Sequence, residues 1–134
     1  MKNTTLIGDI AEAKICAALL AAKYTILLPF SSACRYDIAI EKDGKLFKIQ
    51  CKNAPLKNGS IRIPCYSVNC RTGKQIPYLS QIDFYGVYCP DIEKCYLVPS
   101  NIAGVSSLRL RINNSLTYKN SHSADEFEIR AEVV

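Results

Sequence analysis

Residues 36–40 (YDIAI), 43–44 (DG) and 47–52 (FKIQCK) are the stretch that decides the fold of this chain. Asp-Gly between two alternating apolar runs predicts a β-hairpin with a two-residue loop, and such a loop fixes the register of its strands. In that register Asp37 lies directly opposite Gln50, with Cβ atoms roughly 4.5 to 5.5 Å apart. Lys52 points to the same face, because it lies two residues further along the strand. One face of the hairpin therefore carries a carboxylate, an amide oxygen and an ammonium group.

The opposite face of the predicted hairpin is apolar and should be buried. Its members are Tyr36, Ile38 and Ile40 on the first strand and Phe47, Ile49 and Cys51 on the second. One register accounts for both faces, although a β-bulge would shift the pairing by one residue.

A second carboxylate lies in the segment before the hairpin. Residues 5–24 are rich in Ala, Leu and Ile and predict an α-helix. At helical spacing Glu12 has the neighbours Gly8, Ile15, Cys16 and Leu19, so it projects from the apolar stripe. Burying an unpaired carboxylate is costly, and Glu12 therefore needs a partner. Lys14, Arg35 and a metal-bound water are the three candidates.

Together these residues resemble the PD-(D/E)xK nuclease superfamily. Glu12 on a first helix, Asp37 on a strand and Gln50-x-Lys52 on the next strand match its motifs. The resemblance is greatest to the Q-x-K branch, which includes an endonuclease encoded within a group I intron. It extends over residues 8–12, 32–37, 49–52, 83–88 and 96–99. Tyr36 stands in the place of the motif proline, and Gln50 replaces the acidic residue of the third motif, as is usual in that branch.

The resemblance implies an α/β fold with a restriction-endonuclease-like core, in which α-helices flank a mixed central β-sheet. Residues 1–134 form a single domain in this interpretation. The implied activity is phosphodiester hydrolysis with Mg²⁺, for which Mn²⁺ could substitute. Asp37, the Gln50 side chain and the Cys51 backbone carbonyl would hold the metal, and Glu12 would contribute directly or through water. Lys52 would orient the attacking water and offset the charge that develops in the transition state.

The charge distribution points to a polyanionic partner. The chain carries a formal net charge of +5, and no Asp or Glu occurs from residue 44 through residue 82. A stretch with basic but no acidic residues is expected of a surface that contacts phosphates. The alternative is a solvated basic face without a partner. The candidate contacts to double-stranded DNA are Arg35, Lys48, Lys57, Arg62, Arg71 and Lys74.

The seven cysteines indicate a reducing compartment rather than a disulfide scaffold. Their number is odd and they include no C-x-x-C pair, so a structural zinc site has little support. A disulfide between Cys65 and Cys70 is the alternative that the sequence leaves open. The first helix is interrupted by charged residues, which argues against a signal peptide or a membrane span. We therefore expect a cytoplasmic protein without a membrane partner.

The remaining elements follow from alternation and turn residues. We expect a strand at residues 25–29, continuation of the sheet at 61–64, a loop or ribbon at 71–78 and a hairpin from 84–89 and 95–98. Another strand is expected at 108–112, and short helices at 101–105 and 121–128, the latter capped by Ser123.

Three functions are compatible with these observations. The first is a homing endonuclease that makes a site-specific double-strand break, and the second is a structure-specific nuclease such as a Holliday junction resolvase. The third is a DNA-binding protein that keeps the fold but does not cut. Because one site cuts one strand, double-strand cleavage requires at least a homodimer, and the resemblance also allows a homotetramer.

Overall fold

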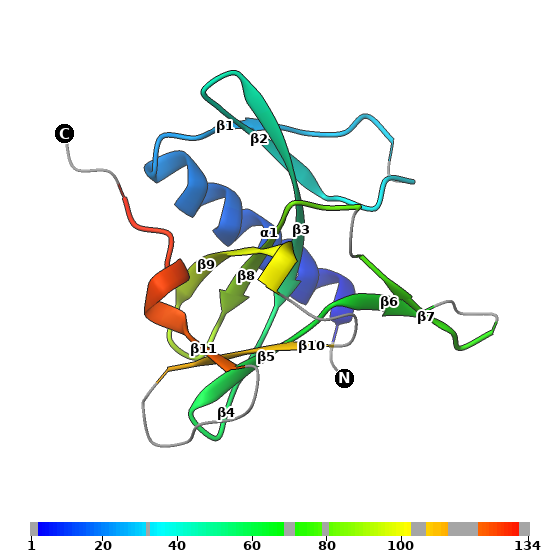
Figure 1. Cartoon of the computed structure of the whole chain (residues 1–134), viewed down its shortest axis with the longest axis vertical. Helices are drawn as coiled ribbons and strands as arrows, with labels where there is room; N and C mark the ends of the chain where they lie inside the picture. Colours follow the sequence, from blue (N-terminus) through cyan, green and yellow to red (C-terminus); the bar gives the residue numbers. More distant parts are fainter. Residues whose placement is uncertain are drawn as a thin grey trace.

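The computed structural model describes residues 3–31, 33–68, 72–78, 81–102, 107–112 and 121–131 (Figure 1). The first elements are α1 (Thr4–Ala21), β1 (Thr25–Leu27), β2 (Ile38–Lys42), β3 (Lys45–Asn53), β4 (Leu56–Lys57) and β5 (Ser60–Pro64). They are followed by β6 (Tyr66–Val68), β7 (Gln75–Pro77), β8 (Phe84–Cys89), β9 (Lys94–Pro99) and the 3₁₀ helix η1 (Ser100–Ile102). The described chain ends with β10 (Ser107–Arg111), β11 (Ser121–Ser123) and the 3₁₀ helix η2 (Ala124–Phe127).

The predicted hairpin is formed by β2 and β3 in the predicted register. Lys42 pairs with Lys45 next to the turn, and Ile38 pairs with Ile49 at the far end. Asp43 and Gly44 both have positive φ, at 54° and 77°. Positive φ at both central residues is what a type I′ turn requires. The Asp-Gly signal therefore predicted this part of the fold correctly.

The regular ladder ends at Ile38, one residue before the carboxylate. The backbone N–H of Asp37 donates to the carbonyl of Ile49 at 2.9 Å, the residue that already pairs with Ile38. Strand alternation consequently breaks here, and Tyr36 packs on the sheet face opposite to Ile38. The prediction that Tyr36 is buried with Ile38 and Ile40 is wrong for this reason.

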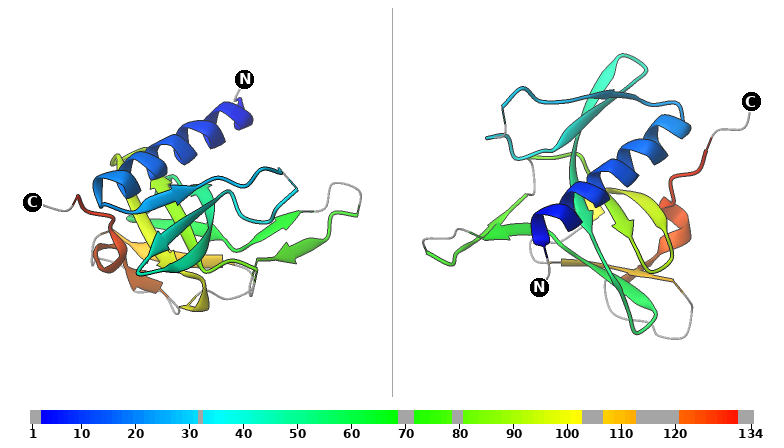
Figure 2. Two further views of the ribbon diagram at one scale, coloured as in Figure 1. Left: turned by 90° about the horizontal axis from the view of Figure 1, so that it is seen from above. Right: turned by 180° about the vertical axis from the view of Figure 1, so that it is seen from behind.

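The central sheet has the strand order β1-β2-β3-β8-β9. It is mixed, because β3 and β8 are parallel and the other neighbours are antiparallel. Helix α1 crosses one face of this sheet, as the two views of Figure 2 show. Its side chains Ala11, Ile15 and Leu19 pack on Ile38, Ile40 and Ile49 of the hairpin.

Gly86 in β8 allows the helix to approach closely. A Cβ atom at this position would lie 3.0 Å from Ile15 Cγ2 and 3.1 Å from Ile49 Cγ2. Both isoleucines are fully buried. Glycine therefore fits best where α1, β3 and β8 meet, because a larger residue would crowd these two side chains.

The other face of the central sheet is covered by a second sheet, with the order β11-β10-β5-β4. The buried side chains that it contributes to this core are Ile61, Ile63, Leu108 and Leu110. Residues 61–64 thus belong to this second sheet, whereas the sequence predicted that they continue the first. The α/β class and the mixed sheet are confirmed; in the described residues a helix covers one face and a sheet covers the other.

Strands β6 and β7 form a two-stranded ribbon that projects from the body of the protein (Figure 1). Its base is closed by a hydrogen bond from the Tyr78 N–H to the Cys65 carbonyl, at 3.1 Å. The ribbon alternative predicted for residues 71–78 is therefore correct for β7 and the residues beside it. Arg71 lies outside the described residues.

The ends of the described chain are held by local contacts. Asn3 caps α1, because its side-chain oxygen accepts a hydrogen bond from the Leu6 N–H at 3.0 Å. At the other end, residues 121–128 form β11 and then η2 rather than one helix, and Ser123 makes no side-chain cap bond. Glu128 forms an ion pair with Lys94 at 3.3 Å, which ties the tail to β9.

Cysteines at six described positions are free thiols: Cys16, Cys34, Cys51, Cys65, Cys89 and Cys95. Cys70, the other member of the pair left open above, lies outside the described residues. No helix in the described ranges is long and apolar enough to cross a membrane.

Candidate active site

Asp37 lies where the chain enters β2, and two backbone hydrogen bonds fix its position. Its own N–H donates to Ile49, and its Oδ2 accepts from the Cys51 N–H at 2.8 Å. The side chain is half-buried. Burial raises the pKa of Asp37, whereas the Cys51 hydrogen bond and the positive charge of Lys52 act in the opposite direction. The carboxylate is thus oriented by the Cys51 N–H in a partly buried environment that favours a nearby cation.

Glu12 is half-buried on α1, one turn before Ile15. Burial raises the pKa of Glu12, and repulsion from Asp37 and Asp9 raises it further. Neither predicted protein partner pairs with it in the described structure. Lys14 lies over the ring of Tyr88 instead, at 6.0 Å from the centroid, and Arg35 lies over the ring of Tyr78.

Both carboxylates line a pocket of about 350 Å³. The rest of its wall comes from the loop after β1 and the residues that precede β2, namely Leu28, Pro29, Phe30, Ser31, Cys34 and Tyr36. Phe30 is fully exposed and Leu28 is 72% exposed. The pocket therefore opens to solvent beside two apolar side chains.

Gln50 and Lys52 occupy alternate positions of β3, so strand alternation places them on one face of the sheet. Both are half-buried. The charge of Lys52 is close enough to lower the pKa of Asp37. Its Nζ lies 4.7 Å from the centroid of the Tyr78 ring. The structure therefore brings the charge of Lys52 near Asp37, but the ladder ends at Ile38, before the predicted pair of Asp37 with Gln50.

Cys51 lies between Gln50 and Lys52, and its side chain faces α1. Burial raises the pKa of its thiol, and the carboxylates of Asp37 and Glu12 raise it further, so the sulfur stays protonated. Its N–H points to Asp37. Because the N–H and C=O of a residue in an extended strand point to the same side, we expect the Cys51 carbonyl on that side too.

The donor set suits a hard divalent cation. Glu12 and Asp37 supply carboxylate oxygens. The described residues contain no group of three or more His, Cys, Asp or Glu side chains that could hold a metal ion, so the further ligands would have to be other oxygen donors. Two carboxylates with further oxygen donors are typical of Mg²⁺, which keeps several waters and binds substrate phosphates. A cation between Glu12 and Asp37 would also relieve their mutual repulsion.

The predicted DNA contacts that the structure describes lie in three places. Arg35 and Lys48 lie near the carboxylates: Arg35 shares the Tyr78 ring with Lys52, and Lys48 Nζ is 5.7 Å from the centroid of Tyr36, which lines the pocket. Lys74 is exposed just before β7. The other two described members, Lys57 and Arg62, are exposed on the second sheet.

Tyr78 is the residue of this site whose place the sequence did not reveal. Its position in the acid-free stretch would also allow an exposed contact to phosphates or bases. It is instead buried, and its ring contacts Arg35, Lys52 and Tyr85. No local pattern signals the contacts with Arg35 and Lys52, because both residues are distant from Tyr78 in sequence.

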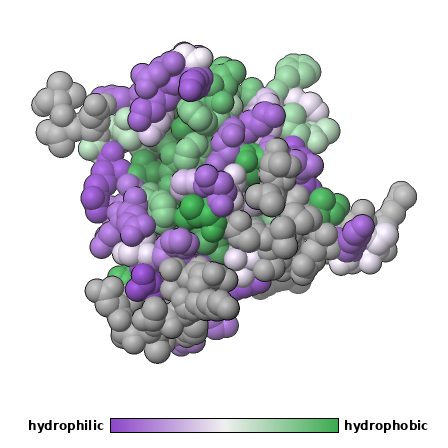
Figure 3. Space-filling view, in the orientation of Figure 1, coloured by the Kyte–Doolittle hydropathy of each residue, from purple (hydrophilic) through white to green (hydrophobic). Residues whose placement is uncertain are grey.

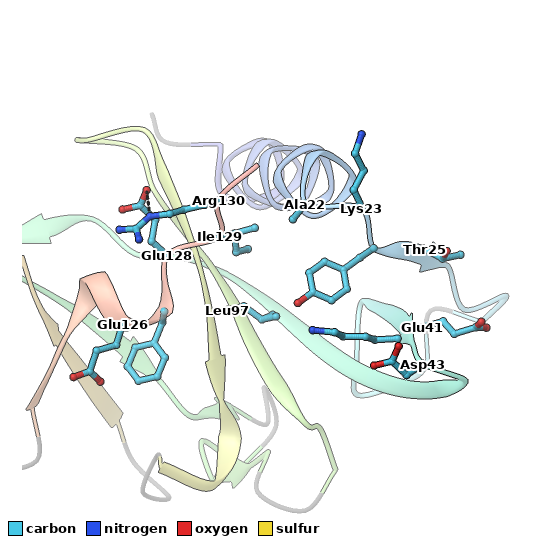
Figure 4. Close-up of a pocket in the computed structure, with 13 residues that line it drawn as sticks. Ala22, Lys23, Thr25, Glu41, Asp43, Leu97, Glu126, Glu128, Ile129 and Arg130 are labelled. Atoms are coloured by element: carbon cyan, nitrogen blue, oxygen red, sulfur yellow. Dashed lines mark ion pairs between the residues drawn. The ribbon is translucent and has the colours of Figure 1, made fainter. Parts of the chain in front are cut away.

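A larger hollow of about 790 Å³ lies elsewhere, between the end of α1, the β2–β3 turn and the tail (Figure 4). Its lining mixes the acidic residues Glu41, Asp43, Glu126 and Glu128 with the basic residues Lys23, Lys42 and Arg130. Figure 4 shows Glu128 paired with Arg130, at 3.7 Å. This mixture of charges does not suit a polyanion, so we place the candidate site at the smaller pocket.

The model of the PD-(D/E)XK endonuclease family matches residues 2–130. The chain belongs to this family. As a PD-(D/E)XK endonuclease it is similar to a solved bacterial homing endonuclease, I-Ssp6803I, with a TM-score of 0.74 and 24% sequence identity. That similarity covers 95% of this chain and 89% of the other and confirms the restriction-endonuclease-like fold. No curated protein matches the sequence.

Proposed function

We propose that this PD-(D/E)XK endonuclease is a magnesium-dependent, site-specific enzyme of the homing type that makes double-strand breaks in DNA. The observation that carries the proposal is the meeting of Glu12 and Asp37 at one open pocket, with Lys52 beside Asp37. The fold of the bacterial homing endonuclease supports the biological role.

In this proposal each residue of the site has a separate role in metal binding or in hydrolysis. Asp37, Gln50 and the Cys51 carbonyl would hold the metal, and Glu12 would bind it directly or through water. The ion would polarise the scissile phosphate and lower the pKa of the attacking water. The Cys51 N–H donates to the Asp37 carboxylate and would keep it in position when that carboxylate binds the metal. Lys52 orients the water and offsets negative charge that develops on the phosphate.

Cleavage of both strands requires at least two copies of the chain, and we propose a homodimer or a homotetramer. Exposed apolar side chains support an assembly. Among the described residues the large ones are Leu6, Ile10, Leu20, Leu27, Leu28, Phe30 and Leu46. In Figure 3 hydrophobic side chains reach the surface in the upper half of the molecule. Residues of this kind mark protein–protein contacts when they lie together.

The test compares wild type with Lys52→Ala on a randomised duplex library in magnesium. We expect Lys52→Ala to lower the cleavage rate by at least about 100-fold, the loss seen when one transition-state donor is removed. Binding of the duplex in calcium, followed by fluorescence anisotropy, should stay near wild type. Lys45→Ala is the matched control, because Lys45 is exposed at the hairpin turn, and it should cleave normally.

A Lys52→Ala variant that cuts at the wild-type rate would contradict this assignment. Four-way junctions in the same assay separate the homing enzyme from a resolvase, since a resolvase prefers the junction to the linear duplex. A wild-type protein that binds DNA but cuts neither substrate in magnesium or manganese would be the non-catalytic DNA-binding protein.

A further inference from the structure

Two cations from different parts of the chain meet at the ring of Tyr78. The Arg35 guanidinium carbon lies 4.2 Å from the ring centroid, and Lys52 Nζ lies 4.7 Å from it. Both distances are well within the limit of about 6 Å for a cation–π contact. The ring itself is buried, and it packs edge-on against Tyr85 with centroids 6.3 Å apart. Tyr78 is therefore a buried surface against which the side chains of Arg35 and Lys52 rest.

Tyr78 also stands at the base of the β6–β7 ribbon. It directly follows β7, and its N–H donates to the Cys65 carbonyl just before β6. Arg35 reinforces this junction, because it donates to the Ile76 carbonyl in β7 at 3.0 Å. The loop before β2, strand β3 and the ribbon are thus joined at one aromatic ring.

We propose that Tyr78 is a positioning residue for Lys52, and that it ties the placement of this lysine to the base of the ribbon. The inference rests on the proposed nuclease function of Lys52. A lysine side chain has several rotatable bonds and loses conformational entropy when it is confined. The electron-rich ring face attracts the ammonium and restricts it to the sheet face that it shares with Gln50, next to Asp37.

The ring, rather than the hydroxyl group, is the part of Tyr78 that contacts both cations. Tyr78→Phe should therefore preserve the arrangement, and Tyr78→Leu should remove it. Tyr88→Leu is a matched control for the loss of a buried tyrosine. Tyr88 and Tyr78 are each 6% exposed, and Lys14 lies over the Tyr88 ring as Lys52 lies over Tyr78.

The first readout is independent of cleavage. In NMR spectra of the DNA-free protein, the side-chain Hε signals of Lys52 should be shifted upfield by the ring current of residue 78. We expect this shift in wild type, Tyr78→Phe and Tyr88→Leu, and its loss in Tyr78→Leu. An unshifted Lys52 signal in wild type would overturn the proposal.

The second readout is the cleavage rate under saturating DNA, at a temperature where circular dichroism shows every variant to be folded. Tyr78→Leu should lower kcat by about 10-fold, equivalent to about 1.4 kcal/mol, while the Kd for duplex DNA in calcium stays unchanged. Tyr78→Phe and Tyr88→Leu should retain the wild-type kcat. Equal losses in Tyr78→Phe and Tyr78→Leu, or a normal kcat in Tyr78→Leu, would refute positioning by the ring.

The two readouts separate the inference from the proposed function. A wild-type protein that shows the Lys52 ring-current shift but cleaves no DNA would contradict the nuclease function of this site and leave the contact with Tyr78 established. Cleavage by wild type with no effect of Tyr78→Leu would contradict only the positioning role.

Discussion

The contact at Gly86 predicts opposite outcomes for two glycine-to-alanine substitutions. In Gly86→Ala the new methyl group would lie 3.0 Å from Ile15 Cγ2 and 3.1 Å from Ile49 Cγ2. Ile15 cannot readily turn away, because a β-branched residue in a helix has one strongly preferred χ1 rotamer. Ile15 and Ile49 must therefore shift by a few tenths of an ångström within a tightly packed contact between α1 and the sheet. Overpacking of this kind typically costs about 1–3 kcal/mol.

The same substitution at Gly8 should stabilise the protein. Gly8 is exposed within α1, and a Cβ atom there would meet nothing within 4 Å. Alanine is favoured over glycine in a helix by about 1 kcal/mol. The comparison separates the steric contact at Gly86 from the general effect of replacing glycine, which restricts the unfolded chain in both variants.

Thermal unfolding followed by circular dichroism measures both effects. For a chain of 134 residues the unfolding entropy near Tm is about 0.3 kcal/mol/K. We therefore expect Gly86→Ala to lower Tm by about 4–10 °C and Gly8→Ala to raise it by about 3 °C. A Tm for Gly86→Ala at or above that of wild type would refute the packing argument.

Two further predictions concern the site and its partner. Without metal, Glu12→Gln should be more stable to urea than wild type at pH 8, and the difference should shrink towards pH 4. Because the pKa of Glu12 is raised in the folded protein, its stabilising contribution is present below the ordinary pKa of 4.5 and is lost as pH rises through the folded-state pKa. A stability difference between Glu12→Gln and wild type that grows on acidification would contradict this prediction. Duplex affinity, measured by fluorescence anisotropy in calcium, should fall steeply between about 50 and 300 mM salt, with a log–log slope of about −0.9 per phosphate contact. A flat salt dependence would exclude a phosphate-contacting surface.

The sequence predicted the hairpin well because its determinants are local. Asp43 and Gly44 fixed the turn, and the alternation of β2 and β3 followed from it. The helical stripe likewise placed Glu12 on a partly apolar surface, where the structure half-buries it beside Asp37. Both predictions needed only local patterns, namely the Asp-Gly turn with the alternation on either side of it and the periodicity of one helix.

Predictions that depended on distant partners were less successful. Residues 61–64 read correctly as a strand, but their alternation does not say which sheet they join, and their partner β10 lies far along the chain. Tyr36 departed from its expected face because the β2–β3 ladder ends at Ile38. Tyr78 meets Arg35 and Lys52 only after the ribbon folds back. Register beyond a ladder end and side-chain packing between elements are tertiary properties.

The parallel pairing of β3 with β8 makes residues 54–83 a crossover between two strands that are fixed next to each other. The ribbon belongs to this crossover, whereas Glu12 and Asp37 precede it. We therefore expect insertions or exchanges within the ribbon to leave the β3–β8 pairing intact when Cys65 and Tyr78 still close its base. Under the proposed nuclease function, an exchange of the ribbon would replace the predicted DNA contact Lys74 and leave the elements that carry Glu12 and Asp37 unchanged.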